Sequence, residues 1–94
     1  MISRSYSLYD VKALSYSPPF FAPTDGIAVR MLQELVGDIN TTVGRHPADF
    51  KLYCIGTFDD QRGILLGLAP AEHVVDAISL VSIEKKLPLE EAAQ

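Results

Sequence analysis

Residues 50–58, FKLYCIGTF, alternate between apolar and more polar positions, and this alternation constrains the fold of the chain most strongly. A period of two residues is typical of a β-strand with one buried face. The polar stretch DDQRG follows at 59–63, and the apolar stretch ILLGL follows at 64–68. Two apolar runs separated by a short polar turn predict a β-hairpin over residues 50–68. The side chains expected on its core face are Phe50, Leu52, Cys54 and Phe58.

The N-terminal segment predicts a further strand. Residues 2–12, ISRSYSLYDVK, combine β-branched and aromatic residues with partial alternation, which would place Tyr6 on one face and Tyr9 on the other. The following stretch, SYSPPFFAPT, contains three prolines, which exclude a regular helix and a central strand. We expect an ordered, extended loop there, because Phe20 and Phe21 are too apolar to remain in solvent without a structural reason.

Two segments have the features of helices. Thr24 is a favourable N-cap, and Asp25 suits the positive end of a helix dipole. Helical apolar spacing then runs through residues 25–36, DGIAVRMLQELV, and Gly37 predicts the end. We expect a second helix from Pro70 through AEHVVDAISLV, because proline suits a first turn and apolar residues recur at helical spacing. The apolar stripe expected on the first helix contains Ala28, Leu32, Leu35 and Ile39.

These elements predict one α+β domain over residues 1–83, in the order β-α-β-β-α. A three-stranded antiparallel sheet with two helices on one face would bury both helical stripes and one face of the hairpin together. Residues 84–94 would form an acidic, partly flexible C-terminal tail. A sheet with one open face often meets a second copy, so we expect a homodimer.

Composition narrows the functional classes. The formal net charge is -4, which is unlike a strongly basic nucleic-acid-binding domain. The charge is uneven, however, since the part up to residue 62 is nearly neutral and the rest is acidic. A single cysteine suits a reducing compartment, and no apolar run reaches the length of a signal peptide or membrane span. We expect a soluble, intracellular protein.

Candidate catalytic and metal-ligating residues have simpler structural interpretations. Cys54, His46 and His73 lack the paired spacing of a zinc site, and Cys54 is expected on the core face. The histidine at 46 precedes a proline, which predicts a shaped loop at the entrance to a strand. Asp59 and Asp60 are favourable turn residues, although two carboxylates could also hold a divalent cation. Phosphate-binding glycine motifs are absent from the sequence. We therefore expect no catalytic residue, no cofactor and no metal.

Basic and aromatic residues are interleaved along the predicted strands, as in proteins that bind single-stranded nucleic acid. Bases would stack on the aromatic rings, and cations would contact the phosphates. Two simpler interpretations remain open: tyrosines on a sheet face often only pack, and Arg30 could pair with Glu34 one helical turn away. The candidate nucleic-acid-binding residues are Arg4, Tyr6, Tyr9, Lys12, Arg30, Arg45, Lys51, Tyr53 and Arg62.

Several landmarks occur together in an order that resembles a known family. PPFF at 18–21, the A-x-R of Ala28 to Arg30, and HPADFKLYCIGTFDDQRG at 46–63 resemble the small non-structural protein of gokushoviruses, which are Microviridae with single-stranded DNA genomes. The resemblance covers roughly residues 6–63. It implies a DNA-binding protein of the bacterial cytoplasm that assists the switch from genome replication to packaging. It implies no catalytic residues.

The expected function is therefore non-enzymatic binding of single-stranded DNA during genome packaging. The alternative is a protein-interaction module, in which Phe20 and Phe21 contact a phage replication or procapsid protein without direct DNA binding. The simpler interpretation of these two residues is that they cap the core of the domain. A metal-dependent activity at Asp59 and Asp60 ranks third.

Overall fold

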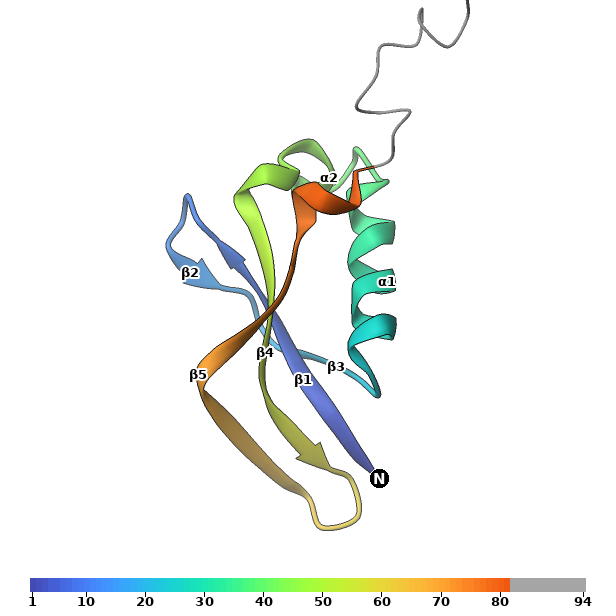
Figure 1. Cartoon of the computed structure of the whole chain (residues 1–94), viewed down its shortest axis with the longest axis vertical. Helices are drawn as coiled ribbons and strands as arrows, with labels where there is room; N and C mark the ends of the chain where they lie inside the picture. Colours follow the sequence, from blue (N-terminus) through green and yellow to red (C-terminus); the bar gives the residue numbers. More distant parts are fainter. Residues whose placement is uncertain (82–94) are drawn as a thin grey trace, which may run out of the picture.

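The computed structural model describes residues 1–81, which form a curled antiparallel sheet with one main helix packed against it (Figure 1). The strands are β1 (Ile2–Asp10), β2 (Ser15–Tyr16), β3 (Phe20–Ala22), β4 (Phe50–Asp59) and β5 (Ile64–Asp76). The helices are α1 (Asp25–Val36) and α2 (Thr42–Arg45), with two short 3₁₀ helices, η1 (Pro47–Asp49) and η2 (Ala77–Leu80). The predicted α+β class is confirmed, and the predicted element order is wrong.

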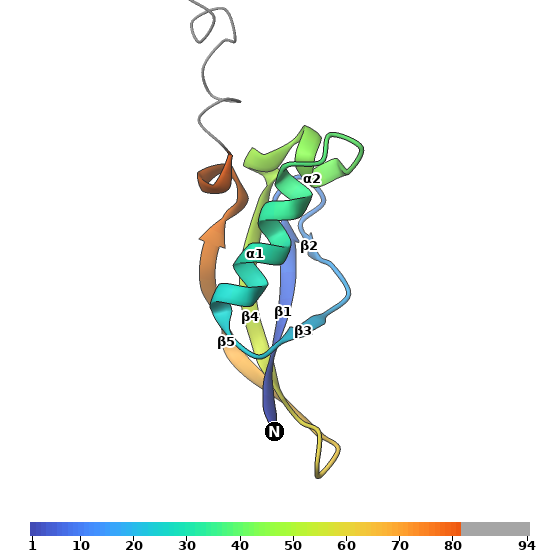
Figure 2. The ribbon, with the colours of Figure 1, turned by 90° about the vertical axis from the view of Figure 1, so that its right-hand side faces the viewer.

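The sheet has the order β2-β1-β4-β5, and β3 pairs with β1 as well. Both short strands lie along the edge of β1 that faces away from β4, with β2 beside its end and β3 beside Arg4–Tyr6 (Figure 2). The proline-containing segment predicted as a loop therefore supplies two edge strands. Edge positions tolerate the missing amide hydrogens of proline, which explains how this segment joins the sheet. The Asp10 side chain accepts from the amides of Lys12 and Ala13 and forms the turn between β1 and β2.

Helix α1 begins and ends where the sequence predicts. The Thr24 hydroxyl accepts from the amide of Ile27 at 3.3 Å, and Gly37 is the C-cap residue. Ala28 and Leu32 are buried against the sheet. Ile39, which was expected on the same stripe, lies beyond the end of the helix and is 69% exposed.

The predicted second helix does not form. Residues 70–76 instead continue β5, and only the four residues of η2 that follow are helical. Lys51 pairs with Asp76 and Tyr53 pairs with His73, so the C-terminal half of β5 completes the hydrogen bonding of β4. Pro70 lies inside β5, which is an edge strand of the described sheet and can accept a residue without an amide hydrogen. The domain boundary and tail expected at 83–94 lie outside the described residues.

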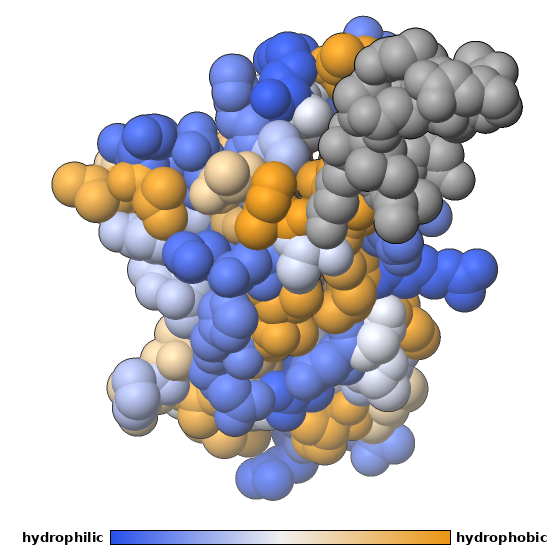
Figure 3. Space-filling model, turned by 45° about the horizontal axis from the view of Figure 1, so that its top comes forward, coloured by the Kyte–Doolittle hydropathy of each residue, from blue (hydrophilic) through white to orange (hydrophobic). Residues whose placement is uncertain are grey.

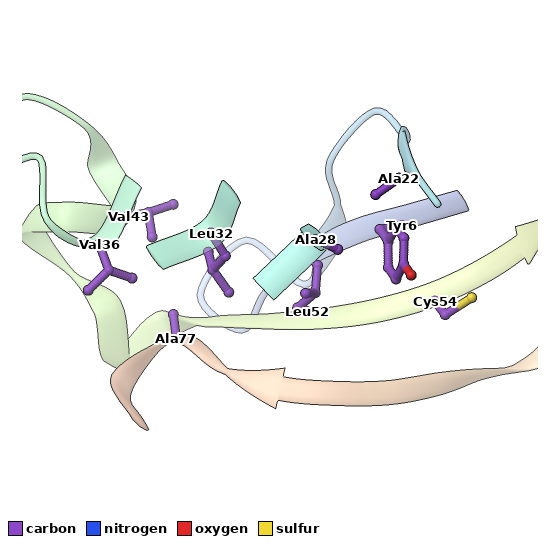
Figure 4. Packing of buried hydrophobic residues seen from close by; sticks show 9 residues of the cluster. All are labelled: Tyr6, Ala22, Ala28, Leu32, Val36, Val43, Leu52, Cys54 and Ala77. Atoms are coloured by element: carbon purple, nitrogen blue, oxygen red, sulfur yellow. The ribbon is translucent and has the colours of Figure 1, made fainter. Parts of the chain in front are cut away.

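The core lies between α1 and the sheet face that carries Tyr6, Leu52 and Cys54 (Figure 4). Leu52 and Cys54 face it as predicted, and Phe50 packs against its margin. The other buried members come from α1, the loops and η2, and the full set is Tyr6, Ala22, Ala28, Leu32, Val36, Val43, Leu52, Cys54 and Ala77. Figure 3 shows that apolar side chains also reach the surface between polar ones.

A β-bulge in β4 corrects the expected position of Phe58. Tyr6 pairs with Cys54 and Ser5 pairs with Gly56, so one residue of β4 is left without a partner on β1. An extra residue reverses the parity of the strand beyond it. Phe58 therefore leaves the core face and packs against Phe21, with ring centroids 5.5 Å apart.

Gly56 lies at this irregularity, where β5 approaches β4 closely. A Cβ atom at residue 56 would clash with the carbonyl oxygen of Leu66. We expect Gly56→Ala to lower the free energy of unfolding by about 1–3 kcal/mol, because the backbone of β5 must move to admit the methyl group. Urea denaturation followed by circular dichroism measures this. Gly67→Ala is the matched control, since no atom lies within 4 Å of its added Cβ. Equal losses in both variants would contradict the close approach.

Candidate nucleic-acid interface

Four ring-bearing side chains form a row across the sheet, one from each of four strands. Tyr16 pairs with Tyr9 between β2 and β1, and Tyr53 pairs with His73 between β4 and β5. The ring centroids are 4.7 Å apart for Tyr9 and Tyr16, 5.7 Å for Tyr16 and Tyr53, and 5.4 Å for Tyr53 and His73. We call these four residues the aromatic row. Pairing across the sheet brings together residues that are far apart in the sequence.

The aromatic row lies on the sheet face opposite α1. Tyr53 lies between Leu52 and Cys54 in β4, whose side chains face the core, and successive side chains of a strand point to opposite faces. Tyr16 is 49% exposed, His73 is exposed, and Tyr9 and Tyr53 are half-buried. The rings therefore support one another while part of their surface stays open to solvent.

A small polar network borders the aromatic row on β4 and β5. The Lys51 ammonium lies 3.3 Å from Oδ1 of Asp76, and the Nε2 of His73 lies 2.7 Å from the same oxygen. The hydrogen bond with His73, together with Lys51, lowers the pKa of Asp76 from its usual value. The carboxylate is therefore ionised at neutral pH and offsets the charge of Lys51.

Another predicted cation, Lys12, is exposed in the turn between β1 and β2.

Two of the predicted binding residues take part in a network between the sheet and α1 instead. Tyr6 is fully buried, and its hydroxyl donates to Oδ1 of Asp25 at 2.6 Å. The guanidinium of Arg4 donates to the same oxygen at 2.8 Å and to Glu72 at 2.9 Å. This network joins β1, the start of α1 and β5. The prediction that Tyr6 stacks on bases is therefore wrong, because its ring has no exposed face. Arg4 is engaged in two ion pairs.

The remaining predicted cations do not gather around the aromatic row. Arg30 is exposed on α1, which packs on the other face of the sheet. Arg45 ends α2 and donates to the carbonyl oxygen of Ile39 at 3.1 Å. Arg62 lies in the turn between β4 and β5. Of the nine predicted residues, the structure thus brings Tyr9, Lys51 and Tyr53 together.

The two phenylalanines proposed for partner binding differ in environment. Phe20 is partly buried and stacks on Tyr6, with ring centroids 5.7 Å apart and planes inclined by 29°. This arrangement agrees with the expectation that Phe20 caps the core. Phe21 points the other way, is half exposed and contacts Phe58.

The residues weighed for metal binding and catalysis have structural roles. Cys54 is buried in the core. The carboxylate of Asp59 accepts from the amides of Gln61 and Arg62, and Asp60 accepts from the N-terminal amine at 2.7 Å. Within residues 1–81, no three histidine, cysteine or acidic side chains are grouped as metal ligands would be.

Sequence reasoning missed Tyr16 and His73 as members of the row. Tyr16 precedes the prolines, and we expected a loop without strand pairing there. His73 was placed on a helix, although the β-branched pair Val74–Val75 that follows it favours a strand. Both errors concern edge strands, whose short or irregular patterns carry little periodicity.

The fold and this site define a small antiparallel α+β protein that exposes an aromatic row on the sheet face away from its helix. A model of the Phage ORF5 protein family matches residues 3–80, so the chain belongs to this family of phage proteins. The match extends beyond residues 6–63 and includes all of β5. No curated protein and no solved structure matches the chain. Among the described residues, no helix has the length and apolarity needed to cross a membrane.

The buried tyrosine gives a prediction about alkaline pH. Burial raises the pKa of Tyr6 to about 12, and the hydrogen bond to Asp25 adds to the rise. Between pH 10 and pH 12 the Tyr6 hydroxyl is ionised in the unfolded chain and neutral in the folded chain. The stability that this group contributes is therefore fully present below pH 10 and is lost as the pH rises to 12. We expect the free energy of unfolding to fall by about 2–3 kcal/mol from this group.

Tyr6→Phe is the control for this prediction, because the variant lacks the titrating hydroxyl. Urea unfolding at several values between pH 9 and pH 12 should show the advantage of the wild-type protein shrinking as the pH rises. Parallel profiles for the two proteins would show that Tyr6 titrates equally in the folded and unfolded states.

Proposed function

We propose that this phage protein binds single-stranded DNA without catalysing a reaction, and that the aromatic row is its stacking surface. The observation that carries the proposal is the alignment of Tyr16, Tyr9, Tyr53 and His73 on one solvent-facing sheet surface. Exposed aromatic rings on a sheet stack on unpaired bases, and each stacked base contributes about 1–3 kcal/mol. Bases inside a duplex are already stacked and cannot use such a surface.

The charge distribution supports a preference for single strands. A net charge of -4 opposes tight non-specific binding to duplex DNA, which depends on many phosphate contacts. Lys12 and Lys51 lie on the strands and turn that carry the aromatic row and would contact a few phosphates. The three predicted arginines outside this surface are Arg30, Arg45 and Arg62. They could contact only a part of the DNA that extends beyond the aromatic row. Binding would therefore rest more on stacking than on charge.

Membership of a phage family supports a role in the phage life cycle. The resemblance of residues 6–63 to the small non-structural protein of gokushoviruses extends this role to the switch from genome replication to DNA packaging. Such a protein would act in the cytoplasm of the host bacterium, where the single-stranded genome is produced and packaged.

Fluorescence anisotropy with labelled oligonucleotides, single-stranded and duplex, over a salt series tests the proposal. We expect Tyr16→Leu to weaken single-strand binding roughly 5- to 150-fold, which corresponds to one lost stacking contact of about 1–3 kcal/mol. Tyr16→Phe is the matched control, because it keeps the ring and should retain the affinity. Tyr16 is the best target because it is the most exposed tyrosine of the row, which limits the effect on folding.

Three outcomes would contradict the proposal. The first is no binding of single strands at low salt. The second is equal affinity of Tyr16→Leu and Tyr16→Phe. The third is tighter binding of duplex DNA than of single strands at every salt concentration.

The network around Asp76 gives a second test at the same site. Asp76→Asn should tighten single-strand binding, because Lys51 would lose the carboxylate that offsets its charge. The slope of log affinity against log salt should steepen by about 0.7 if Lys51 gains one phosphate contact. Asp38→Asn is the control, since Asp38 is exposed in the loop after α1 and makes the same change in net charge. Equal effects of the two variants would remove Lys51 from the interface.

A second candidate function, docking of a phage replication or procapsid protein, is supported by an apolar groove beside α1. The groove has a volume of about 290 Å³, and its lining contains Leu8, Phe20, Met31, Leu32, Glu34 and Leu35. Phe20→Ala would disturb the core, because the ring stacks on Tyr6. Met31→Glu is the sharper test, since Met31 is exposed. A folded variant that loses capture of the phage's own procapsid or replication protein would support docking, and unchanged capture would exclude the groove.

A further inference from the structure

The hairpin formed by β4 and β5 extends beyond α1 at one end of the molecule (Figures 1 and 2). In the described part of the chain, β5 pairs with β4 alone, so its second edge has no neighbouring strand. In an antiparallel sheet alternate residues of an edge strand direct their backbone N–H and C=O groups outward. The N-terminal half of β5 therefore offers a row of backbone groups that a further strand could pair with.

The pairing of β5 with β4 is irregular between Gly67 and Glu72. Apart from this irregularity and Pro70, the N-terminal half of β5 lacks the features that usually protect an edge strand. No charged residue lies between Arg62 and Glu72, and three leucines in that interval are exposed. Leu65 is 59% exposed and Leu66 is 61% exposed, and these neighbours point to opposite faces of the strand. Natural proteins usually place lysines or other charges on such edges to prevent pairing. Pro70 is the one residue in the interval that cannot donate a backbone hydrogen bond, and it limits the open edge to residues 64–69.

We infer that residues 64–69 of β5 pair antiparallel with the same residues of a second copy, which makes the protein a homodimer with a sheet that continues across the interface. A second copy fits this edge because both partners are uncharged and apolar there, so pairing brings no like charges together. Nucleic acid does not fit, since residues 63–71 carry no cation that could contact phosphates. This inference does not depend on the proposed DNA binding.

The symmetry of such a dimer predicts which side chains meet. The two-fold axis must be perpendicular to the sheet, and residues that oppose each other must then lie on the same face. When the pairing is centred on residues 64–69, two registers are possible. Either Leu66 pairs with Leu66 of the second copy, or Gly67 pairs with Gly67 of the second copy. In both registers the two Leu66 side chains are direct or diagonal neighbours on one face. An added Cβ at Gly67 would meet no atom within 4 Å, so the sheet face at the centre of the segment is uncovered.

Light scattering coupled to size-exclusion chromatography, over a range of concentrations of the full chain, tests the inference. We expect the wild-type protein to show about twice the mass of one 10.3 kDa chain. Leu66→Lys should give the mass of one chain, because two ammonium groups would become direct or diagonal neighbours across the interface. Leu14→Lys is the matched control, since Leu14 is 74% exposed in the turn between β1 and β2 and should leave the dimer intact. Circular dichroism verifies that both variants are folded.

A charge-complementation experiment tests the contact directly. An equimolar mixture of Leu66→Lys and Leu66→Glu should recover the dimer mass, although each variant alone should remain a monomer. A wild-type monomer at every concentration would overturn the inference. A dimeric Leu66→Lys variant, or a mixture that stays monomeric, would place any dimer contact elsewhere and would equally overturn it.

Discussion

The arrangement of this molecule depends on the pairing of β4 along both of its edges. β4 pairs with β1 from Phe50 to Asp59 and with β5 over nearly the same length. A ten-residue central strand leaves many backbone groups without partners unless both neighbours are long. This requirement extends β5 as far as Asp76, where helical spacing of apolar residues would otherwise favour a helix. It also leaves α1 as the only long helix of the described residues, packed against one face of the sheet.

Because β4 is the central strand, its bulge determines which side chains face the core and which face solvent. Tyr6, Leu52 and Cys54 face α1, and Tyr9 and Tyr53 face away from it. Beyond the bulge the parity of β4 reverses, so Thr57 rather than Phe58 lies beside Arg4 on the face of α1. The carboxylate of Asp25 then accepts from both Arg4 and Tyr6 and fixes the N-terminus of the helix to β1. Polar contacts thus hold the N-terminal end of the helix against β1.

Features with strong local periodicity could be predicted from the sequence. α1 has a cap at Thr24 and a clear apolar stripe, and the alternation in β4 places Leu52 and Cys54 in the core. The errors arise where a contact distant in sequence overrides the local pattern. β2 and β3 form because β1 has a free edge, and Phe58 changes face because of a one-residue bulge. For the same reason the alternation in the sequence predicted Tyr9 and Tyr53 as binding residues but missed Tyr16 and His73. These two residues join the aromatic row only because the edge strands β2 and β5 pair with β1 and β4.

The aromatic row and the open edge at residues 64–69 involve different halves of β5. His73 and Asp76 belong to its C-terminal half, beside Tyr53 and Lys51, and the uncharged leucines belong to its N-terminal half, beyond the end of α1. Self-pairing at residues 64–69 would therefore leave the aromatic row of each copy uncovered. The acidic character of the chain fits this division, because stacking needs exposed rings and strand pairing needs backbone groups. Neither interaction requires a strongly basic surface, so a net charge of -4 is compatible with both.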